Sequence, residues 1–534
     1  MTALGTSTVW ATMAHGIFTE LYFPAVDQPQ VKDFGFMVAA PGWWREVKRV
    51  DSYTLSTPAP TLALPTIVHT STDPAAAYQL TLQPVVDPVN NAVLIAYDLQ
   101  GDGVSLYPLL APHLGICQPT NGPQAGLGAD NSAWVDPADQ AMFADGSGHY
   151  LCLLAAPGFS RAGVGYVGDT DGWTDFNRNT SMTLTYTQAG PGVIALTGEL
   201  AGGSGLLAVG FADSQDAARA ASQASLDAGY PATSAAFTQG WQAWAADRTL
   251  PAPTAPAGLA DALRQSAAVL RTHADHTVAG ALVAGLAIPW GNVTNDPGGY
   301  HMMWCRDGGE TALALAAAGY PDEAATTLGY LISQQNPADG SWPRCFFITG
   351  TNTRMPGAVQ LDEVAFPLLL AGKLAEMGVT LPVGTDDAVR LAAGYLAANG
   401  PVSNQDVDRW EENAGASAFT IGLEIVALLV AASRLTGSDQ ALALALADNW
   451  NERLEEFTYI AGDELDQVFG TDGHYVRIGL AGGGRVTLGN QPPGSRRSST
   501  QRRWWAWSSS TCPGLACATP RTRRSPTPSP SWRQ

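Results

Sequence analysis

The sequence predicts a multidomain protein in which a β domain, expected to be a β-sandwich, precedes a domain built from helices. The chain has 534 residues, and a single hydrophobic core rarely grows beyond about 250–300 residues. Short alternating segments punctuated by Gly and Pro fill residues 1–212, whereas apolar residues recur with helical spacing over 258–490. We therefore expect two domains, joined by a linker over residues 213–257.

The first 212 residues contain several runs in which apolar and polar residues alternate, separated by turn clusters such as LQGDG and QAGPG. Many short strands of this kind are typical of a sandwich. We predict strands at Tyr78–Val85, Ala92–Leu99, Met182–Gln188 and Val193–Leu200. The runs GVIALTGEL and SGLLAVGFA, joined by AGGS, are predicted to form a hairpin.

Residues 213–257 begin with an Ala-rich helical segment and end in the Pro-rich stretch LPAPTAPAG, which is typical of a linker. The following residues have apolar positions near i, i+3, i+4 and i+7, as expected for helices packed in antiparallel hairpins. We predict seven helices at 262–274, 309–320, 322–335, 363–378, 387–400, 417–435 and 439–454.

The last 44 residues, 491–534, differ from the rest of the chain: they contain 8 Arg but no Lys, Asp or Glu, and no periodic pattern. We expect this basic tail, rich in Ser, Pro and Trp, to be disordered and to result from a shifted reading frame. A basic segment that binds a polyanion is the alternative.

The net charge of −20 disfavours a nucleic acid partner, because nucleic acid binders usually carry a basic surface. The longest strongly apolar stretch, 425–433, is shorter than the roughly 18–20 residues needed to cross a membrane. The N-terminus has no basic region followed by a long apolar run, so no signal peptide is expected. The chain as written is expected to be cytoplasmic, and a secreted ancestor remains open.

The first candidate site motif is RWEENAG, in which Trp410, Glu411 and Glu412 precede an apolar helix. Two adjacent carboxylates are costly to bury as anions, so one beside an indole face would keep its proton longer, as a general acid requires. Acidic residues in the first turn of a helix also interact favourably with its dipole. The motif alone therefore leaves a structural role open.

The second motif, PGGYHMMWCRDGGET, places Trp304, Arg306 and Asp307 at the start of a predicted helix. An Arg–Asp pair can present fixed donors and acceptors to several sugar hydroxyls. A surface ion pair at a helix start is the alternative.

The third motif combines DGSWPR with QLDEVAFP, and contains Trp342 and Asp362. The indole could stack on a sugar ring and the carboxylate could orient one. A buried loop anchor and an acidic residue at a helix start are the alternatives.

Taken in order, GGYHMMWCRD, DGSWPR, QLDEVAFP and RWEENAG resemble the bacterial branch of glycoside hydrolase family 15, which includes glucoamylases, glucodextranases and some trehalases. The stretch from Val9 to Val38 also looks like the start of the β-sandwich that precedes the catalytic domain in these enzymes. The resemblance covers about residues 5–490 and implies an (α/α)6 barrel that hydrolyses terminal α-glucosidic bonds with inversion. It makes Glu411 the general acid. The implied substrate-binding residues are Trp304, Arg306, Asp307, Trp342, Asp362, Trp410 and Glu412.

Inversion needs a second carboxylate as base, about 6.5–9.5 Å from the acid. In the family this base comes from the last part of the barrel, whereas residues 491–534 contain no Asp or Glu. Seven helices are also fewer than the twelve of six hairpins. We therefore expect an incomplete barrel without its base, with exposed apolar helix faces and a poorly folded helical half.

The predicted function is release of glucose from the ends of α-linked glucans, including maltooligosaccharides and isomaltooligosaccharides. The alternatives are a carbohydrate-binding remnant without catalysis, and a trehalase. No cofactor and no metal site are assigned: His273 and His276 lack an evident third ligand. Structural calcium at acidic loops stays open, although no acidic loop has EF-hand spacing.

Overall fold

The computed structural model describes residues 1–56, 64–115, 131–248, 256–286, 300–348, 359–402, 409 and 413–479. These residues divide into two compact units. The first comprises 1–359 and 366–392, and the second comprises 360–365 together with the residues from 393 onward. The tail over 491–534 and the Trp410–Glu412 motif lie outside the described residues, so the predictions made for them stay predictions.

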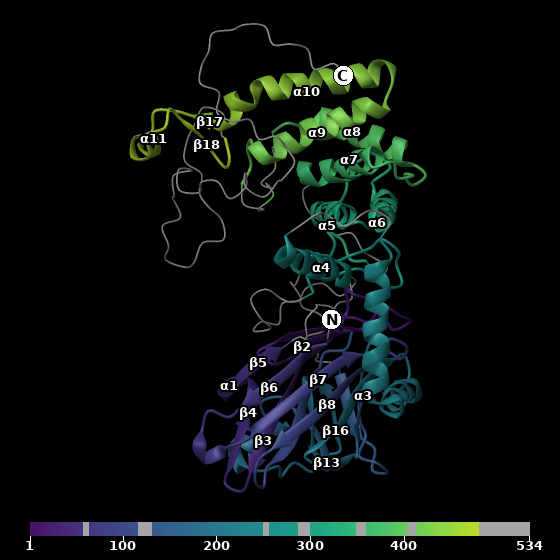
Figure 1. Ribbon diagram of the computed structural model, residues 1–534, viewed down its shortest axis with the longest axis vertical. Helices are drawn as coiled ribbons and strands as arrows, with labels where there is room; N and C mark the ends of the chain where they lie inside the picture. Colours follow the sequence, from purple (N-terminus) through teal and green to yellow (C-terminus); the bar gives the residue numbers. More distant parts are fainter. Residues whose placement is uncertain are drawn as a thin grey trace. The chain divides into compact units, whose positions relative to one another are not determined.

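The N-terminal part of the first unit contains two antiparallel sheets within the described residues, as expected for a sandwich (Figure 1). The first sheet has the path β1-β2-β3-β9-β15-β13, with β4 paired to β3. Its strands are β1 (Trp10–Ala14), β2 (Ile17–Tyr22), β3 (Pro29–Ala40), β4 (Trp43–Glu46), β9 (Ser105–Pro112), β13 (Phe159–Tyr166) and β15 (Ile194–Leu200).

The second sheet has the order β14-β10-β11-β12-β16-β8-β7-β6-β5. Its strands are β5 (Ser52–Ser56), β6 (Thr66–Thr70), β7 (Gln79–Val86), β8 (Ala92–Gln100), β10 (Asn131–Val135), β11 (Met142–Gly146), β12 (His149–Ala156), β14 (Gln188–Gly192) and β16 (Ser204–Ala212). Short helices lie between strands: α1 (Val47–Val50), the 3₁₀ helix η1 (Pro74–Ala76) and α2 (Gly172–Asn179).

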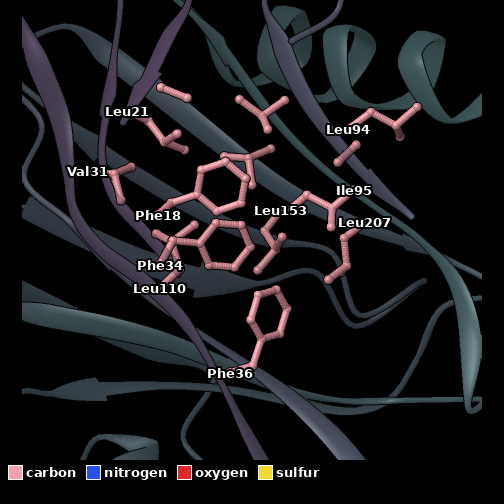
Figure 2. Close-up of a cluster of buried hydrophobic side chains, with 14 of the residues drawn as sticks. Phe18, Leu21, Val31, Phe34, Phe36, Leu94, Ile95, Leu110, Leu153 and Leu207 are labelled. Atoms are coloured by element: carbon pink, nitrogen blue, oxygen red, sulfur yellow. The ribbon is translucent and has the colours of Figure 1, made fainter. Parts of the chain in front are cut away.

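The inner faces of the two sheets share one hydrophobic core (Figure 2). Phe18 and Phe34 of the first sheet stack with ring centroids 5.6 Å apart. Ile95 and Leu207 of the second sheet belong to the same buried cluster. Alternate residues of each strand face this core because successive side chains of a strand point to opposite faces. The predicted β-sandwich is confirmed.

Two local predictions in this domain were wrong. Residues 193–200 and 204–212 do not pair as a hairpin: β15 belongs to the first sheet and β16 to the second. The short link between them therefore crosses from one sheet to the other. Both segments have the same alternation of apolar and polar residues because each has one face in the same core. Residues 182–187 form no strand, and pairing begins only at β14.

Helix α3 (Gln215–Ala246) lies where a linker was predicted, and it contacts β16, β12 and β8. The hydroxyl of Ser222 in α3 donates a 2.8 Å hydrogen bond to the backbone carbonyl of Cys152 in β12. Gly229, with φ of 75°, interrupts the helix, and Pro231 follows that break. A position with positive φ favours glycine. Because this backbone conformation is not helical, the helix kinks at Gly229.

All seven predicted helices form, with ends that differ by a few residues. The helices of this half are α4 (Ala257–Thr272), α5 (Cys305–Ala317), α6 (Pro321–Gln334), α7 (Leu361–Glu376), α8 (Thr385–Asn399), α9 (Ala418–Arg434), α10 (Gly437–Thr458) and α11 (Glu464–Phe469), with β17 (Tyr459–Ile460) and β18 (His474–Tyr475) as a small ribbon. Helix α5 packs on α6 in the first unit, and α9 lies beside α10 in the second (Figure 1).

Within the described ranges, none of the helices combines the length and the apolar character that a membrane crossing requires.

Candidate active site

The start of α5 brings together three of the predicted sugar-binding residues. Trp304 is the N-cap residue, with extended backbone, and Arg306 and Asp307 form the first helical turn. Asp307 lies where a negative charge interacts favourably with the helix dipole. The Arg306 Nε and Asp307 Oδ2 atoms are 3.8 Å apart, and the arginine side chain is largely buried whereas the aspartate is more open. This turn can therefore present guanidinium donors and a carboxylate together.

An aromatic pair stands next to this turn. The rings of Tyr300 and Trp304 have centroids 5.6 Å apart, and Tyr300 is 43% exposed whereas Trp304 is only 7% exposed. Between them, His301 is buried, and burial lowers the pKa of its imidazole to about 4. This histidine is thus uncharged at neutral pH. Tyr300 offers the more accessible aromatic surface, and the sequence analysis did not single it out.

The loop that contains Trp342 is joined to the loop before α5. Met303 and Phe346 exchange two backbone hydrogen bonds of 2.9 and 3.0 Å. Trp342 itself is fully buried, and its Nε1 donates a 2.7 Å hydrogen bond to the carbonyl of Leu331 in α6. Trp342 therefore anchors its loop to α6, which was the structural alternative in the sequence analysis. Its role in stacking on a sugar stays a prediction.

Trp410, Glu411 and Glu412 of the RWEENAG motif lie outside the described residues, but the residues on either side of them are described, within the second unit. The guanidinium of Arg409 lies over the ring of Phe419, 3.9 Å from its centroid. After the motif, Asn413 accepts a hydrogen bond from Arg477. Ala416 and Gly479 exchange backbone hydrogen bonds of 2.9 and 2.7 Å. The chain is thus held on both sides of Glu411, directly before α9.

The second unit also contains a group of buried carboxyl groups. Asp362 and Glu363, in the first turn of α7, are almost inaccessible, and Glu424 in α9 has no exposed surface. Among the residues that the structure describes, neither oxygen of Glu424 has a hydrogen-bond partner. Burial, and then the nearby charge of Asp362, raise the pKa of Glu424 well above its ordinary value. Such a glutamate holds its proton to a higher pH than an exposed glutamate does.

Glu424 is not among the residues predicted from the sequence, because it lies inside the apolar run IGLEIVALLVAA, whose pattern indicates only a helix. A single acidic residue on an otherwise apolar helix face is the signal that could have identified it, since charged residues are seldom fully buried.

Comparison with known families accounts for both halves of the chain. Residues 1–246 match the family model described as glucodextranase, domain N. Residues 259–337 and 344–489 match the model of glycosyl hydrolases family 15. The helical half of the chain matches glycosyl hydrolase family 15. The family resemblance inferred from the four sequence motifs is thereby confirmed, together with the order of a β-sandwich followed by family 15 helices.

Individual proteins of this kind are similar to the chain over most of its length. It is 27% identical to a glucoamylase from Clostridium sp. (strain G0005) over 494 residues, which are 88% of this chain and 65% of that protein. A solved structure of a bacterial glucoamylase complexed with acarbose matches with a TM-score of 0.79 and 25% identity, covering 91% of this chain and 71% of the other. The chain thus spans just under two thirds of the length of this curated relative.

Proposed function

We propose that this chain binds the ends of α-linked glucans and hydrolyses the terminal glucosidic bond in the manner of a glucoamylase. The observation that carries the proposal is the similarity, over both domains, to a bacterial glucoamylase whose solved structure contains acarbose. The proposed ligands are maltooligosaccharides or isomaltooligosaccharides.

The turn at the start of α5 is proposed to hold the terminal glucose. The guanidinium of Arg306 donates to sugar hydroxyls and the carboxylate of Asp307 accepts from them. The pair can therefore bind both the oxygen and the hydrogen of a hydroxyl group. Trp304 and Tyr300 provide an aromatic surface beside this pair, and sugar C–H faces pack on such surfaces. We propose Asp362, Trp342, Trp410 and Glu412 as further substrate-binding residues.

Glu411 is proposed as the general acid. It transfers its proton to the glycosidic oxygen as the bond to the anomeric carbon breaks, so the leaving sugar departs as an alcohol. In an inverting reaction a second carboxylate removes a proton from the attacking water. No residue of this chain is assigned as that base, and substrate binding and turnover are therefore separate questions for experiment.

The test measures both quantities on the full chain. Glucose release from maltotriose is followed enzymatically, and binding of maltotriose or acarbose is followed by isothermal titration. We expect maltotriose and acarbose both to bind, Glu411→Gln to keep binding within a few fold, and any glucose release to fall by at least about 100-fold in that variant. The anomer released first, read by NMR, should be β.

Each outcome is informative. Binding without glucose release in the wild-type chain would favour a non-catalytic carbohydrate-binding remnant. Turnover of trehalose in preference to maltotriose would make the protein a trehalase. Absence of both binding and release, in a chain whose circular dichroism shows folded helices, would overturn the proposal.

A further inference from the structure

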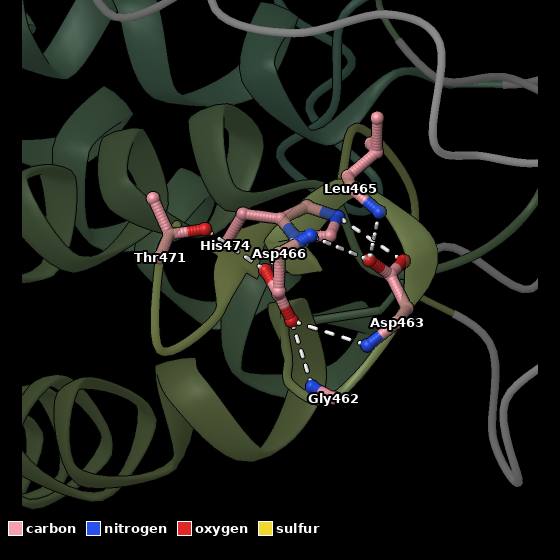
Figure 3. A network of polar contacts seen from close by, with 6 residues as sticks. All are labelled: Gly462, Asp463, Leu465, Asp466, Thr471 and His474. Carbon is pink, nitrogen blue, oxygen red and sulfur yellow. Dashed lines mark hydrogen bonds and ion pairs between the residues drawn. The ribbon is translucent and has the colours of Figure 1, made fainter. Parts of the chain in front are cut away.

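A second cluster of ionisable side chains lies in the second unit, at the start of α11 and in β18 (Figure 3). Asp463 caps α11, Asp466 stands in its first turn, and His474 belongs to β18. All three side chains are buried, and one ligand atom of each lies within 4.8 Å of the others. The proposed glucan hydrolysis does not use them.

The carboxylate of Asp466 is engaged by hydrogen-bond donors on both oxygens. Oδ2 accepts from the backbone N–H groups of Gly462 and Asp463, at 2.7 and 3.2 Å. Oδ1 accepts from the hydroxyl of Thr471 at 3.1 Å and from Nδ1 of His474 at 2.9 Å. An ionised carboxylate only accepts hydrogen bonds, so the imidazole carries a hydrogen on Nδ1.

The other ring nitrogen of His474 is in a different situation. Nε2 is buried in a side chain that is only 3% exposed, and none of the described residues gives it a hydrogen-bond partner. It lies 3.6 Å from Oδ2 of Asp463 (Figure 3). In the neutral imidazole with hydrogen on Nδ1, the lone pair of Nε2 is turned toward an anionic oxygen. Such an arrangement is repulsive unless a cation or a proton lies between the two atoms.

The separation matches that of two ligands on one metal ion. Zinc ligands of the nitrogen and oxygen type lie about 2.0–2.2 Å from the metal, so two of them at a tetrahedral angle are about 3.4 Å apart. Metal-binding histidines also usually donate their other N–H to a carboxylate, which fixes the ring. The hydrogen bond from His474 to Asp466 has this form.

We propose that Nε2 of His474 and Oδ2 of Asp463 bind a divalent transition-metal ion of the zinc class, with Asp466 as the positioning residue that orients the imidazole. An imidazole ligand favours zinc over calcium or magnesium, which prefer oxygen-only sites. Water completes the coordination shell. The ion would join α11 to β18, and its function is structural.

The test uses the full chain after dialysis against a chelator. Equilibrium dialysis against ZnCl2, followed by elemental analysis, measures bound zinc per chain. His474→Asn keeps a donor near the position of Nδ1 but removes the ligand nitrogen. Asp463→Asn keeps a good helix cap but removes the anionic ligand. Thr471→Val is the matched control, because it removes a hydrogen bond to Asp466 and leaves both ligands in place.

We expect the wild-type chain and Thr471→Val to bind one zinc ion that His474→Asn and Asp463→Asn lose. Asp466→Asn should weaken zinc affinity by about 10- to 100-fold, as expected for loss of a partner that orients a ligand. Equal zinc content in all variants would overturn the proposal and leave a protonated His474 in an ion pair.

A second measurement covers the case in which a ligand variant does not fold. X-ray absorption at the zinc edge of the wild-type protein should show nitrogen and oxygen neighbours at about 2.0–2.2 Å, including imidazole scattering. A shell containing sulfur, or oxygen alone, would contradict a site made by His474 and Asp463.

Discussion

Oδ2 of Asp27 accepts a 2.7 Å hydrogen bond from the backbone N–H of Ile348, 321 positions later in the chain. A second buried aspartate makes the converse link: Oδ2 of Asp275 accepts from the backbone N–H of Val26 at 2.9 Å. The β2–β3 loop of the sandwich is thus tied to two loops of the helical half within the first unit. One of these loops continues from Trp342 and pairs with the residues before α5.

Replacement of Asp27 by alanine should therefore destabilise more than the sandwich. The buried N–H of Ile348 would lose its acceptor, at a cost of about 1–3 kcal/mol in the free energy of unfolding. Urea unfolding followed by circular dichroism measures the change, with Asp102→Ala, at an exposed turn residue, as the control. A loss no larger than that of the control would mean that this link contributes nothing to stability.

Arg306→Lys tests the proposed sugar-binding turn. Lysine keeps the charge but lacks the planar fork that can contact two acceptors at once. If Arg306 holds the terminal glucose, maltotriose binding should weaken by about 10- to 100-fold, which corresponds to loss of a charge-assisted hydrogen bond. Isothermal titration measures this, and Arg161→Lys, whose partner Glu199 lies in the sandwich, should leave binding unchanged. Equal affinity of wild type and Arg306→Lys would remove Arg306 from the proposed site.

Glu424→Gln should change how stability depends on pH. Since the pKa of Glu424 is raised on folding, the folded state holds a proton that the unfolded state releases. The wild-type protein therefore loses stability as pH rises above the unfolded value near 4.5, by up to about 1.4 kcal/mol per pH unit, until the folded pKa is passed.

The glutamine variant lacks this titration, so its stability relative to wild type should increase as the pH rises above about 5. Urea unfolding at several pH values gives the difference. Glu456→Gln, at an exposed carboxylate whose pKa is lowered by Arg453, is the control and should not gain stability as pH rises. Parallel pH curves for wild type and Glu424→Gln would contradict a protonated buried glutamate.

Gly340→Ala should destabilise the loop that leads to Trp342. Gly340 has φ of +85°, and an added Cβ would lie 2.3 Å from the carbonyl oxygen of Leu391. Strain and the clash together should cost about 1–3 kcal/mol or more in the free energy of unfolding.

Gly394→Ala in α8 is the matched comparison, because no atom lies within 4 Å of its added Cβ. There alanine should stabilise by about 0.5–1 kcal/mol, since glycine is a poor helix former. Thermal unfolding of the two variants should therefore move in opposite directions, and equal shifts would contradict the backbone geometry of Gly340.

The periodic patterns predicted the secondary structure well where one face of an element is apolar. All seven helices were located, and the ends of β7 and β8 were correct to within about a residue. The pattern did not predict that β15 pairs with β9 and β13 and not with β16. Two strands that face one core have the same alternation of apolar and polar residues whether or not they share a sheet.

For the site, the sequence indicated that Trp304, Arg306 and Asp307 act together, because they occupy one helix start. It did not indicate that Trp342 is anchored through Leu331, since burial of an indole depends on residues distant in the chain. Sequence alone therefore determined the order of domains, the helices and the resemblance of the helical half to family 15, all of which follow from local spacing and motif order. Only the tertiary structure decided which polar groups lie without solvent, as at Glu424 and His474. Desolvation and the approach of distant charges give these groups their chemistry, and neither is encoded in any short stretch of sequence.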